Sequence, residues 1–555
     1  MRSIYRWAVL LITLNWASAF AMIHDPRAVE ADPTTAQAAI APRLEGLGSH
    51  SMPITTSNAD SQHFFDQGLR LTYGFNHSEA LRSFKEAVRL DPDNAMAYWG
   101  WALVLGPNLN LPMQEAVAEQ AFMAVQAAVA RKDNVTPREQ AYIDALAVRY
   151  APVAPIDRTP LDEAYAQAMA ELVAAYPEDL DAATLYAASL MNLSPWNYWY
   201  KDGSPGPNTD KLIGALASVV TRNPEHPGAL HYHIHAVEAV HPKDGVSSAD
   251  ALLPLMPGAG HMVHMPSHIY MRVGRYADAF DANRRASDAD SSYVAQCNAQ
   301  GIYPLLYYPH NLHFLVWAAM FQGRSEAALA GAREVQSKIP VDIEGNAFGV
   351  FETFLSQPLY VMVRFGMWDQ ILAEPEPVKG NRFMRGVWHY ARGMALSNTG
   401  KPRAAAREQA ALAELREALS SDYVVGFANA PKLLQIAHLV LTGDMQGQQD
   451  DYDGAIATLS RAARLEDSLL YNEPPDWYFP TRHVLGALLL KGGYASEAAV
   501  VYWDDLRKNP ANGYSLLGLS QAQAAMGDNA GAQSTRRQFD EAWSAADVEL
   551  SSSRF

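Results

Sequence analysis

The segment 68–92, GLRLTYGFNHSEALRSFKEAVRLDP, has the spacing that decides the fold. Gly68 is followed by Ala80 after 12 residues, by Phe84 after 4 more, and by Pro92 after a further 8. The same intervals recur late in the chain at Gly486, Ala498, Tyr502 and Pro510. Small residues at fixed distances from an aromatic residue favour closely packed helices, and the proline favours a helix end.

The rest of the chain also has helical character. Ala-rich stretches at 115–131, 162–175 and 403–420 lack the alternation of strands, and Pro and Gly punctuate the sequence at short intervals. The spacing resembles the tetratricopeptide repeat, a helix–turn–helix of about 34 residues. This resemblance implies an all-α solenoid over 59–545, a right-handed superhelix of antiparallel helix pairs. Such a solenoid commonly binds a peptide or protein in its concave groove.

Composition and charge limit the classes of function that the protein can have. The chain has 555 residues, 60 acidic and 43 basic, with a net charge of −17. A nucleic-acid surface needs clustered positive charge, so we expect no nucleic-acid partner. Hydrophobic residues make up 49%, enough for a large packed interior.

Residues 1–21 have the pattern of a signal peptide. Arg2 and Arg6 precede the apolar run 8–14, and Ala17-Ser18-Ala19 or Ala19-Phe20-Ala21 offers a cleavage site. We expect an exported protein, periplasmic or secreted, with no membrane span; an uncleaved anchor is the alternative. Residues 22–58 are expected to form a flexible leader and 546–555 a C-terminal tail. The lone Cys297 excludes an internal disulfide, and we expect it to be buried.

Ten of the 17 histidines lie between residues 226 and 313. Most belong to three short patterns in which the spacing places the side chains on one helix face. The candidate metal ligands are His231, His235, Glu238, His261, His264, His268, His310 and His313. His233 is out of phase and is expected to point elsewhere.

The repeat register relates these patterns to one another. His231 and His235 follow Pro224 by 7 and 11 residues, as His264 and His268 follow Pro257. His261 and His264 precede Ala279 by 18 and 15 residues, as His310 and His313 precede Ala328. The histidines therefore occupy equivalent positions on the first helices of three repeats within 224–340. The repeat family implies that this is the concave face, so up to seven imidazoles should converge.

Crowded imidazoles indicate a transition-metal site, because neutral ring nitrogens bind such an ion at about 2.0–2.1 Å. Hydrogen bonding to carboxylates and tyrosines, or recognition of an acidic peptide, is the alternative. One or two ions are possible. Copper is favoured, partly because four methionines flank the cluster; iron is second and zinc third. Glu238 is either a ligand or a partner that orients an imidazole.

Other residues are candidates for substrate binding. Tyr270, Tyr308 and Trp317 lie close to the histidines in the sequence and offer an aromatic wall, with ordinary repeat packing as the alternative. Arg482 and His483 follow an aromatic loop at 475–480 and are candidates for binding an anion.

As a whole, the chain resembles exported bacterial tetratricopeptide-repeat proteins with a histidine-rich middle, through residues 231–238, 257–270, 308–313 and 473–480. The resemblance implies the fold and no particular reaction. From the residues, we expect a metal-dependent oxidoreductase acting on a small organic substrate. A metal-handling or peptide-binding scaffold without turnover is the alternative, and a zinc metallohydrolase is the third hypothesis.

Overall fold

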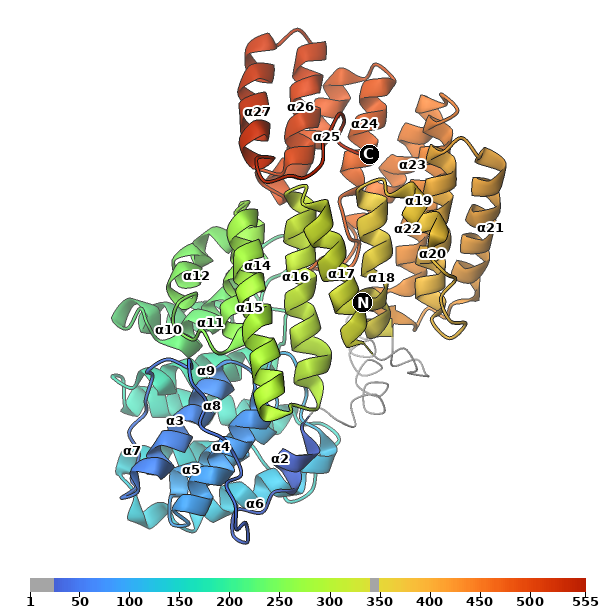
Figure 1. The fold of residues 1–555 in the computed structure, drawn as a ribbon. Coiled ribbons are helices and arrows are strands. Elements are labelled where there is room, and N and C mark those ends of the chain that lie inside the picture. The colour runs from blue at the N-terminus through green and yellow to red at the C-terminus, as the bar shows by residue number, and fades with distance from the viewer. Residues whose placement is uncertain (1–23, 340–348) are drawn as a thin grey trace. The chain divides into compact units, whose positions relative to one another are not determined.

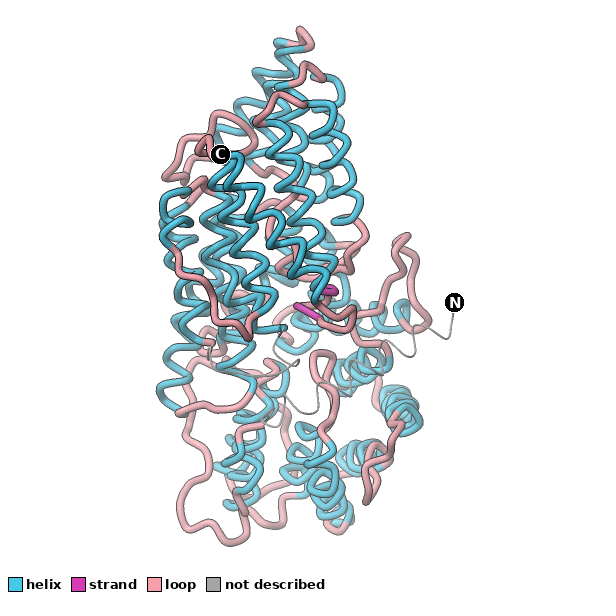
Figure 2. The backbone as a smooth tube through the Cα atoms, turned by 90° about the vertical axis from the view of Figure 1, so that its right-hand side faces the viewer, coloured by secondary structure: helices cyan, strands magenta, loops and turns pink. Residues whose placement is uncertain are grey.

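The computed structural model describes residues 24–339 and 349–555, which are largely helical (Figures 1 and 2). Within these ranges the named strands are β1 (Val424–Val425) and β2 (Ala428–Asn429), an antiparallel pair that aligns Val424 with Asn429. The predicted all-α class is confirmed. The predicted signal peptide, 1–21, lies outside the described residues.

The described chain divides into two compact units, where the sequence predicted one continuous solenoid. We call residues 24–269 and 285–308 the N-terminal unit, and residues 270–284, 309–339 and 349–555 the C-terminal unit. The division falls within α14 (Pro266–Val273) and α15 (Tyr276–Cys297), and after the first residue of α16 (Tyr308–Phe321).

The other helices of the N-terminal unit are α2 (Pro26–Glu30), α3 (Ala59–Tyr73), α4 (His77–Leu90), α5 (Ala95–Leu105), η1 (Glu115–Val117), α6 (Ala118–Val129), η2 (Lys132–Asn134), α7 (Pro137–Ala147), α8 (Thr159–Ala175), α9 (Leu180–Leu193), α10 (Thr209–Arg222), α11 (Pro227–Val237), η3 (Pro242–Gly245), α12 (Val246–Leu252), α13 (Gly260–His264) and the π-helix η4 (Tyr303–Tyr307).

The C-terminal unit adds α17 (Ser325–Lys338), α18 (Gly349–Arg364), α19 (Trp368–Ala373), α20 (Arg382–Asn398), α21 (Pro402–Ala418), α22 (Ala430–Gly447), α23 (Tyr452–Glu466), α24 (Thr481–Lys491), α25 (Ala495–Lys508), α26 (Gly513–Ala525) and α27 (Asn529–Ala542).

Helices pack in the order of a repeat solenoid within each unit. Successive helices pack on one another, as α3, α4 and α5 do in the N-terminal unit and α24 through α27 do in the C-terminal unit. The first helix of one pair also packs on the first helix of the following pair: α3 on α5, α5 on α7, α20 on α22, and α24 on α26. This double contact stacks helix pairs side by side, which is the arrangement of a tetratricopeptide-type solenoid.

The glycines of the repeat pattern allow this close packing. A Cβ atom built on Gly68 would lie 2.8 Å from the Phe84 ring, and one on Gly100 would lie 2.3 Å from it. Phe84 therefore fills the space between α3 and α5, where no larger residue than glycine fits. In the C-terminal unit, Tyr502 packs in the same way between Gly486 and Gly518.

Residues 24–58, predicted to be a flexible leader, are instead fixed against α3 and α4. Lys85 is fully buried, and its Nζ donates to the backbone carbonyls of Ala28, Val29 and Ala31 at 2.7–2.8 Å. The backbone N–H of Ile40 donates to Glu86 at 2.8 Å. Polar side chains of the first helix pair thus bind the backbone of this segment, and composition alone gives no sign of such pairing.

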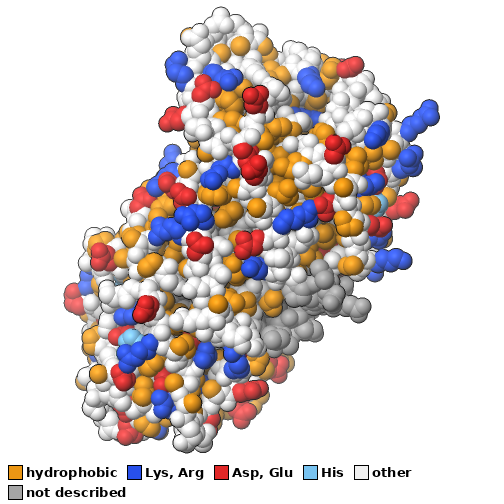
Figure 3. Space-filling view, viewed as in Figure 1, with side chains coloured by type: hydrophobic (Ala, Val, Ile, Leu, Met, Phe, Trp, Pro, Cys, Tyr) orange, Lys and Arg blue, Asp and Glu red, His pale blue; other side chains and the backbone are white. Residues whose placement is uncertain are grey.

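Among the described residues, no helix is both long and apolar enough to cross a bilayer. On the face drawn in Figure 3, acidic and basic side chains are interspersed and histidines are rare. The rarity on this face agrees with the burial of many histidines inside the solenoid.

Candidate metal centre

Helix α11 carries the first two candidate ligands. His226 caps its N-terminus by accepting a hydrogen bond at Nδ1 from the Ala229 backbone at 3.2 Å, and Pro227 occupies the first helical position. All residues of α11 are buried, because α3, α9, α10 and α12 pack around it. His231 and His235 therefore lie inside the protein, one helical turn apart.

His261, on α13, meets these two histidines. One ring nitrogen from each of His231, His235 and His261 lies within 4.8 Å of the others. Nε2 of His231 is 3.2 Å from Nε2 of His261. Two nitrogens bound to one ion at about 2.0–2.1 Å, at angles of roughly 90–110°, would be about 2.9–3.4 Å apart. The observed separation fits two ligands of a single ion.

The other ring nitrogen of His231 is held by the backbone. Its Nδ1 lies 2.5 Å from the carbonyl oxygen of Tyr73, which can only accept a hydrogen bond. This contact assigns the proton to Nδ1 and turns the Nε2 lone pair toward His261. Histidines that bind metals commonly donate their second N–H to a carbonyl or carboxylate in this way.

A second pair of facing nitrogens involves His264 and His268. Their Nε2 atoms are 3.0 Å apart. The Ser267 hydroxyl donates to the His264 carbonyl at 2.6 Å and so can accept from Nδ1 of His264, 3.3 Å away. With the proton on Nδ1 of His264, its Nε2 lone pair points at His268, and a cation between the rings would stabilise the pair.

Glu238 follows α11 directly and contacts two of the imidazoles. Its Oε1 is 3.3 Å from Nδ1 of His235, and its Oε2 is 3.2 Å from Nδ1 of His268. Both contacts are to Nδ1, so neither involves Nε2 of these rings. Of the two roles predicted for Glu238, this geometry favours orientation of the imidazoles over direct coordination.

The charge state of His231 suits metal binding. Burial lowers the pKa of His231 to about 4, so the ring is neutral near pH 7. Neutral imidazole is the form that coordinates transition ions. His233 points away, as predicted, with its Nδ1 2.9 Å from the Ser248 hydroxyl.

His310 and His313 belong to the C-terminal unit, on α16. Burial lowers the pKa of His310 to about 4, and burial together with the His310 charge lowers that of His313 to about 3. Both rings pack against phenylalanines, His310 against Phe314 and His313 against Phe354. Five of the seven predicted histidines thus gather within the N-terminal unit, and the convergence of all seven stays a prediction.

The predicted aromatic wall consists of buried side chains. Tyr270, Tyr308 and Trp317 are all at most 5% exposed. Within the C-terminal unit, the Arg275 guanidinium stacks on Tyr270 at 4.1 Å, and Trp317 packs edge-on against Phe321. These contacts match ordinary helix packing, the alternative reading of these aromatics. Cys297 is buried, as expected.

Arg482 and His483, the predicted anion-binding pair, are engaged within the C-terminal unit. Arg482 donates to both oxygens of Asp467 at 2.8–2.9 Å. His483 is fully buried, with Nδ1 3.0 Å from Arg364 Nη1 and Nε2 2.8 Å from Asp505 Oδ2. An ion pair with Asp467 and hydrogen bonds to Arg364 and Asp505 therefore occupy the groups that were expected to bind an anion.

The sequence did not predict a further buried polar group, which is centred on Asp181. Asp181 Oδ1 accepts from the Tyr73 hydroxyl at 2.6 Å and lies 2.9 Å from Nε2 of His50 and 3.3 Å from Nε2 of His226. His226 uses Nδ1 as the acceptor of its helix cap, so Nε2 carries the proton and donates. This group is a satisfied hydrogen-bond network that fixes Tyr73, whose carbonyl orients His231. His50 and Asp181 lie far from the histidine-rich segment, so spacing gave no signal for them.

No protein-family model and no curated protein matches the chain. Among solved structures, human IFIT1 in a dimer with m7Gppp-AAAA has a TM-score of 0.31 and 14% identity, covering 88% of this chain and 91% of that chain. Naa15/Naa10 bound to HypK-THB has a TM-score of 0.22 and 12% identity, covering 87% of this chain and 70% of that chain. Likeness this distant identifies neither a ligand nor an activity.

Proposed function

We propose that the N-terminal unit binds one or two transition-metal ions through its buried histidines. The observation that carries this proposal is the pair of short Nε2–Nε2 separations, 3.2 Å between His231 and His261 and 3.0 Å between His264 and His268. In three of the four rings, those of His231, His264 and His268, a carbonyl, a hydroxyl or a carboxylate contacts Nδ1, so packing alone poorly explains why the Nε2 atoms face one another. A shared cation explains it.

The proposed ligands form two groups. His231, His235 and His261 would hold one ion, and His264 and His268 would contribute to a second or complete the first. Glu238 would orient His235 and His268 through their Nδ1 atoms. Copper is favoured, then iron, with zinc third, and imidazole nitrogens suit all three ions.

A metal-dependent oxidoreductase acting on a small organic substrate is the activity we propose for this site. A bound copper or iron ion would supply redox chemistry, while the imidazoles fix its position and the buried setting limits access of water. A vacant coordination position in the loaded protein would support catalysis, and full saturation would support metal handling without turnover. Zinc with Glu238 close to its bound water would support a hydrolase.

We also propose that the protein is an exported bacterial tetratricopeptide-repeat protein, periplasmic or secreted. The proposal rests on the signal-like sequence of residues 1–21, and the net charge of −17 supports the absence of a nucleic-acid partner. Expression of the full chain with comparison of the N-terminus in cell extract and exported fraction tests it. Recovery of the uncleaved chain only from the cytoplasm would contradict export.

Metal content is the test of the central proposal. Full-length protein without an affinity tag is loaded separately with Cu²⁺, Fe²⁺ or Zn²⁺, desalted, and measured by elemental analysis. We expect about one or two equivalents of copper in the wild type and a clear loss in His261→Ala. His233→Gln is the matched control, because His233 is on α11 but contacts Ser248. Wild-type protein that retains less than about a tenth of an equivalent of every ion would refute the site.

A further inference from the structure

Two aromatic residues of the N-terminal unit have a backbone conformation that favours glycine. Phe75 has φ of 55° and Trp196 has φ of 63°, and they are the aromatic residues with positive φ in the described part of the chain. This left-handed conformation is costly for a bulky side chain. Residues held in it tend to cluster at functional sites, so the surroundings of the two rings are informative.

Trp196 is the third residue of a tight turn. The turn begins at Ser194, has Pro195 as its second residue, and is closed by the Asn197 N–H, which donates to the Ser194 carbonyl at 3.0 Å. A positive φ at the third position of such a turn favours glycine or asparagine. An indole placed where glycine fits better indicates that the ring itself has a role.

The loop that carries Trp196 is fixed to the end of α11. Trp199 Nε1 donates to the Ala236 carbonyl at 2.8 Å, next to His235 in the chain. Tyr198, in the same loop, is 4% exposed, and burial raises its pKa, as does the nearby charge of Glu238. These contacts hold the loop against the part of α11 that carries a proposed metal ligand.

The Trp196 indole lies directly against that ligand. Its ring is edge-on to the His235 ring, with centroids 5.1 Å apart and an angle of 88° between the planes. Trp196 is 37% exposed, whereas His235 is 3% exposed. The contact therefore joins a buried candidate ligand to a residue at the protein surface.

The Phe75 ring closes another side of the first histidine group. Its centroid is 4.5 Å from that of His231, 5.5 Å from His261 and 5.9 Å from His235. The ring is only 4% exposed, and it also stacks on Tyr232 at 5.8 Å. Phe75 therefore covers the side of the group that faces α3 and α4.

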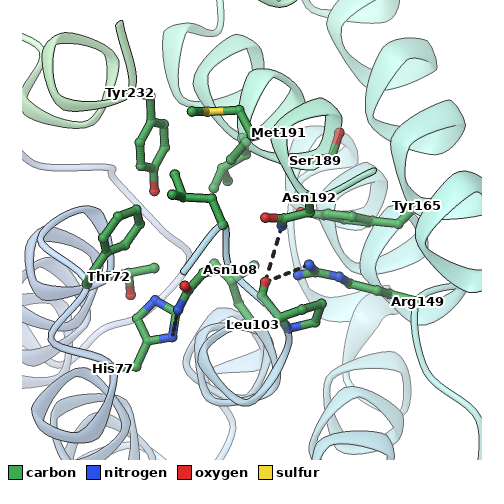
Figure 4. A pocket seen from close by; sticks show the side chains of 15 residues that line it. Thr72, His77, Leu103, Asn108, Arg149, Tyr165, Ser189, Met191, Asn192 and Tyr232 are labelled. Carbon is green, nitrogen blue, oxygen red and sulfur yellow. Dashed lines mark hydrogen bonds between the residues drawn. The ribbon is translucent and has the colours of Figure 1, made fainter. Parts of the chain in front are cut away.

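The cavity beside Phe75 is too small to admit a substrate. It holds about 40 Å³, room for no more than a few waters and far below the roughly 300–1,000 Å³ of a small-molecule site. Tyr232 lines it, and Arg149 and Asn192 both donate to the Pro107 carbonyl, at 2.9 and 3.2 Å (Figure 4). A molecule larger than water thus has no room on this side.

The other rings beside the first histidine group are also buried. Tyr232 packs on His231 at 5.3 Å and Tyr307 packs on His261 at 5.1 Å, and each tyrosine is 4% exposed. Of these neighbouring rings, that of Trp196 is the one that reaches the surface.

We propose that Trp196 controls access to the metal centre, so that ions and small molecules from solvent reach the first histidine group past its indole. What passes the indole rests on the proposed metal function, whereas the cover over His235 does not. Removal of an access residue speeds binding and release alike and leaves affinity nearly unchanged. Loss of a residue that positions a ligand would lower affinity instead.

Diethyl pyrocarbonate, which modifies accessible neutral imidazoles, tests the cover in metal-free, full-length protein. Mass spectrometry gives the modification rate of each histidine. In wild type, we expect His235 to react at least about tenfold more slowly than the exposed His241. In Trp196→Gly, His235 should react at least about tenfold faster than in wild type, because the turn tolerates glycine and the cover is gone. Trp196→Phe keeps a ring and should restore slow modification.

Three controls separate local opening from other effects. His233 lies on another face of α11, so its rate should not change in Trp196→Gly; a rise there would signal unfolding. Trp503→Ala removes an indole that is 56% exposed in the C-terminal unit, and Ala511→Gly relieves a positive φ of 57°. Neither should change the modification rate of His235.

Equal modification rates of His235 and His241 in wild type would overturn the proposal without any variant. An unchanged His235 rate in folded Trp196→Gly would also overturn it.

Copper kinetics test what passes the indole. Cu²⁺ uptake, and its release to a chelator, should both be at least about tenfold faster in Trp196→Gly, with affinity within a factor of about three. Lower affinity without faster uptake would make Trp196 a positioning residue and overturn the access role. Wild-type protein that retains no copper would refute the metal function alone, since the modification rates of His235 are measured without metal.

Discussion

Buried histidines in the two units have different partners at their ring nitrogens. In the C-terminal unit, His483 places Nδ1 3.0 Å from Arg364 and Nε2 2.8 Å from Asp505, so both ring nitrogens have ordinary polar partners. In the N-terminal unit, Nε2 of His231 faces Nε2 of His261 instead. Burial alone therefore does not distinguish a metal ligand from a structural histidine. Our proposal of a metal site rests instead on the partner of each ring nitrogen.

The largest expected effect concerns the number of ions. If His264 and His268 hold a second ion, the double variant His264→Ala/His268→Ala should retain one equivalent of copper where wild type retains two. The two Nε2 atoms, 3.0 Å apart, are replaced by methyl groups that cannot coordinate. Elemental analysis after equal loading gives the count. Unchanged metal content would assign both rings to hydrogen bonding and remove them from the site.

Substitution of His483 should lower the stability of the folded protein. His483→Ala removes one hydrogen-bond partner from each of the buried Asp505 and Arg364, which we expect to cost about 1–3 kcal/mol in free energy of unfolding. Urea denaturation of the metal-free protein measures this loss. His483→Gln retains an acceptor and a donor and should recover much of the stability. Copper content should not change in either folded variant; a loss would mean that this network also supports the metal centre.

Removal of the Glu238 charge should weaken metal binding without abolishing it. Glu238→Gln puts an amide where a carboxylate faces Nδ1 of both His235 and His268. Loss of such an orienting partner commonly lowers metal affinity by about 10–100-fold. Competition with a chelator of known affinity measures the change. A loss as complete as in His261→Ala would instead make Glu238 a direct ligand.

The hydroxyl and the backbone carbonyl of Tyr73 have different partners, so their roles can be tested separately. Tyr73→Phe removes the hydroxyl that donates to Asp181 at 2.6 Å but keeps the carbonyl that binds His231. We expect a loss of about 1.5–3 kcal/mol in free energy of unfolding, typical of a hydrogen bond to a charged group. Metal affinity should stay within a factor of about three. A tenfold loss would show that Asp181 acts on the centre through the tyrosine ring.

Helical class and repeat packing were predictable because they depend on local spacing. Gly68 and Phe84 belong to one helix pair, and the intervals between them are readable from a single stretch of chain. The same periodicity correctly predicted that His231 and His235 share a helix face and that His233 does not. It gave no sign that the described chain divides into two units, or that Lys85 binds the segment 24–58, because those outcomes depend on contacts between distant residues.

Phe75 is an exception to the repeat pattern that the sequence itself contains. Aligning 68–92 with 486–510 puts Phe75 opposite Gly493, so an exception at a turn position is visible without coordinates. Its meaning is not visible, since the left-handed backbone and the three imidazoles under the ring appear only in the folded chain.

By itself, the sequence determined a helical repeat protein with an unusual concentration of imidazoles on corresponding helix faces. Tertiary structure decided which of those imidazoles meet, which ring nitrogen each presents, and that Glu238 contacts two of them through Nδ1. The physical reason is that helical period fixes the direction of a side chain relative to its own helix, whereas a ligand set requires atoms from different helices to lie within about 3–5 Å. Only the packed helices bring Tyr73, His231 and His261 that close together.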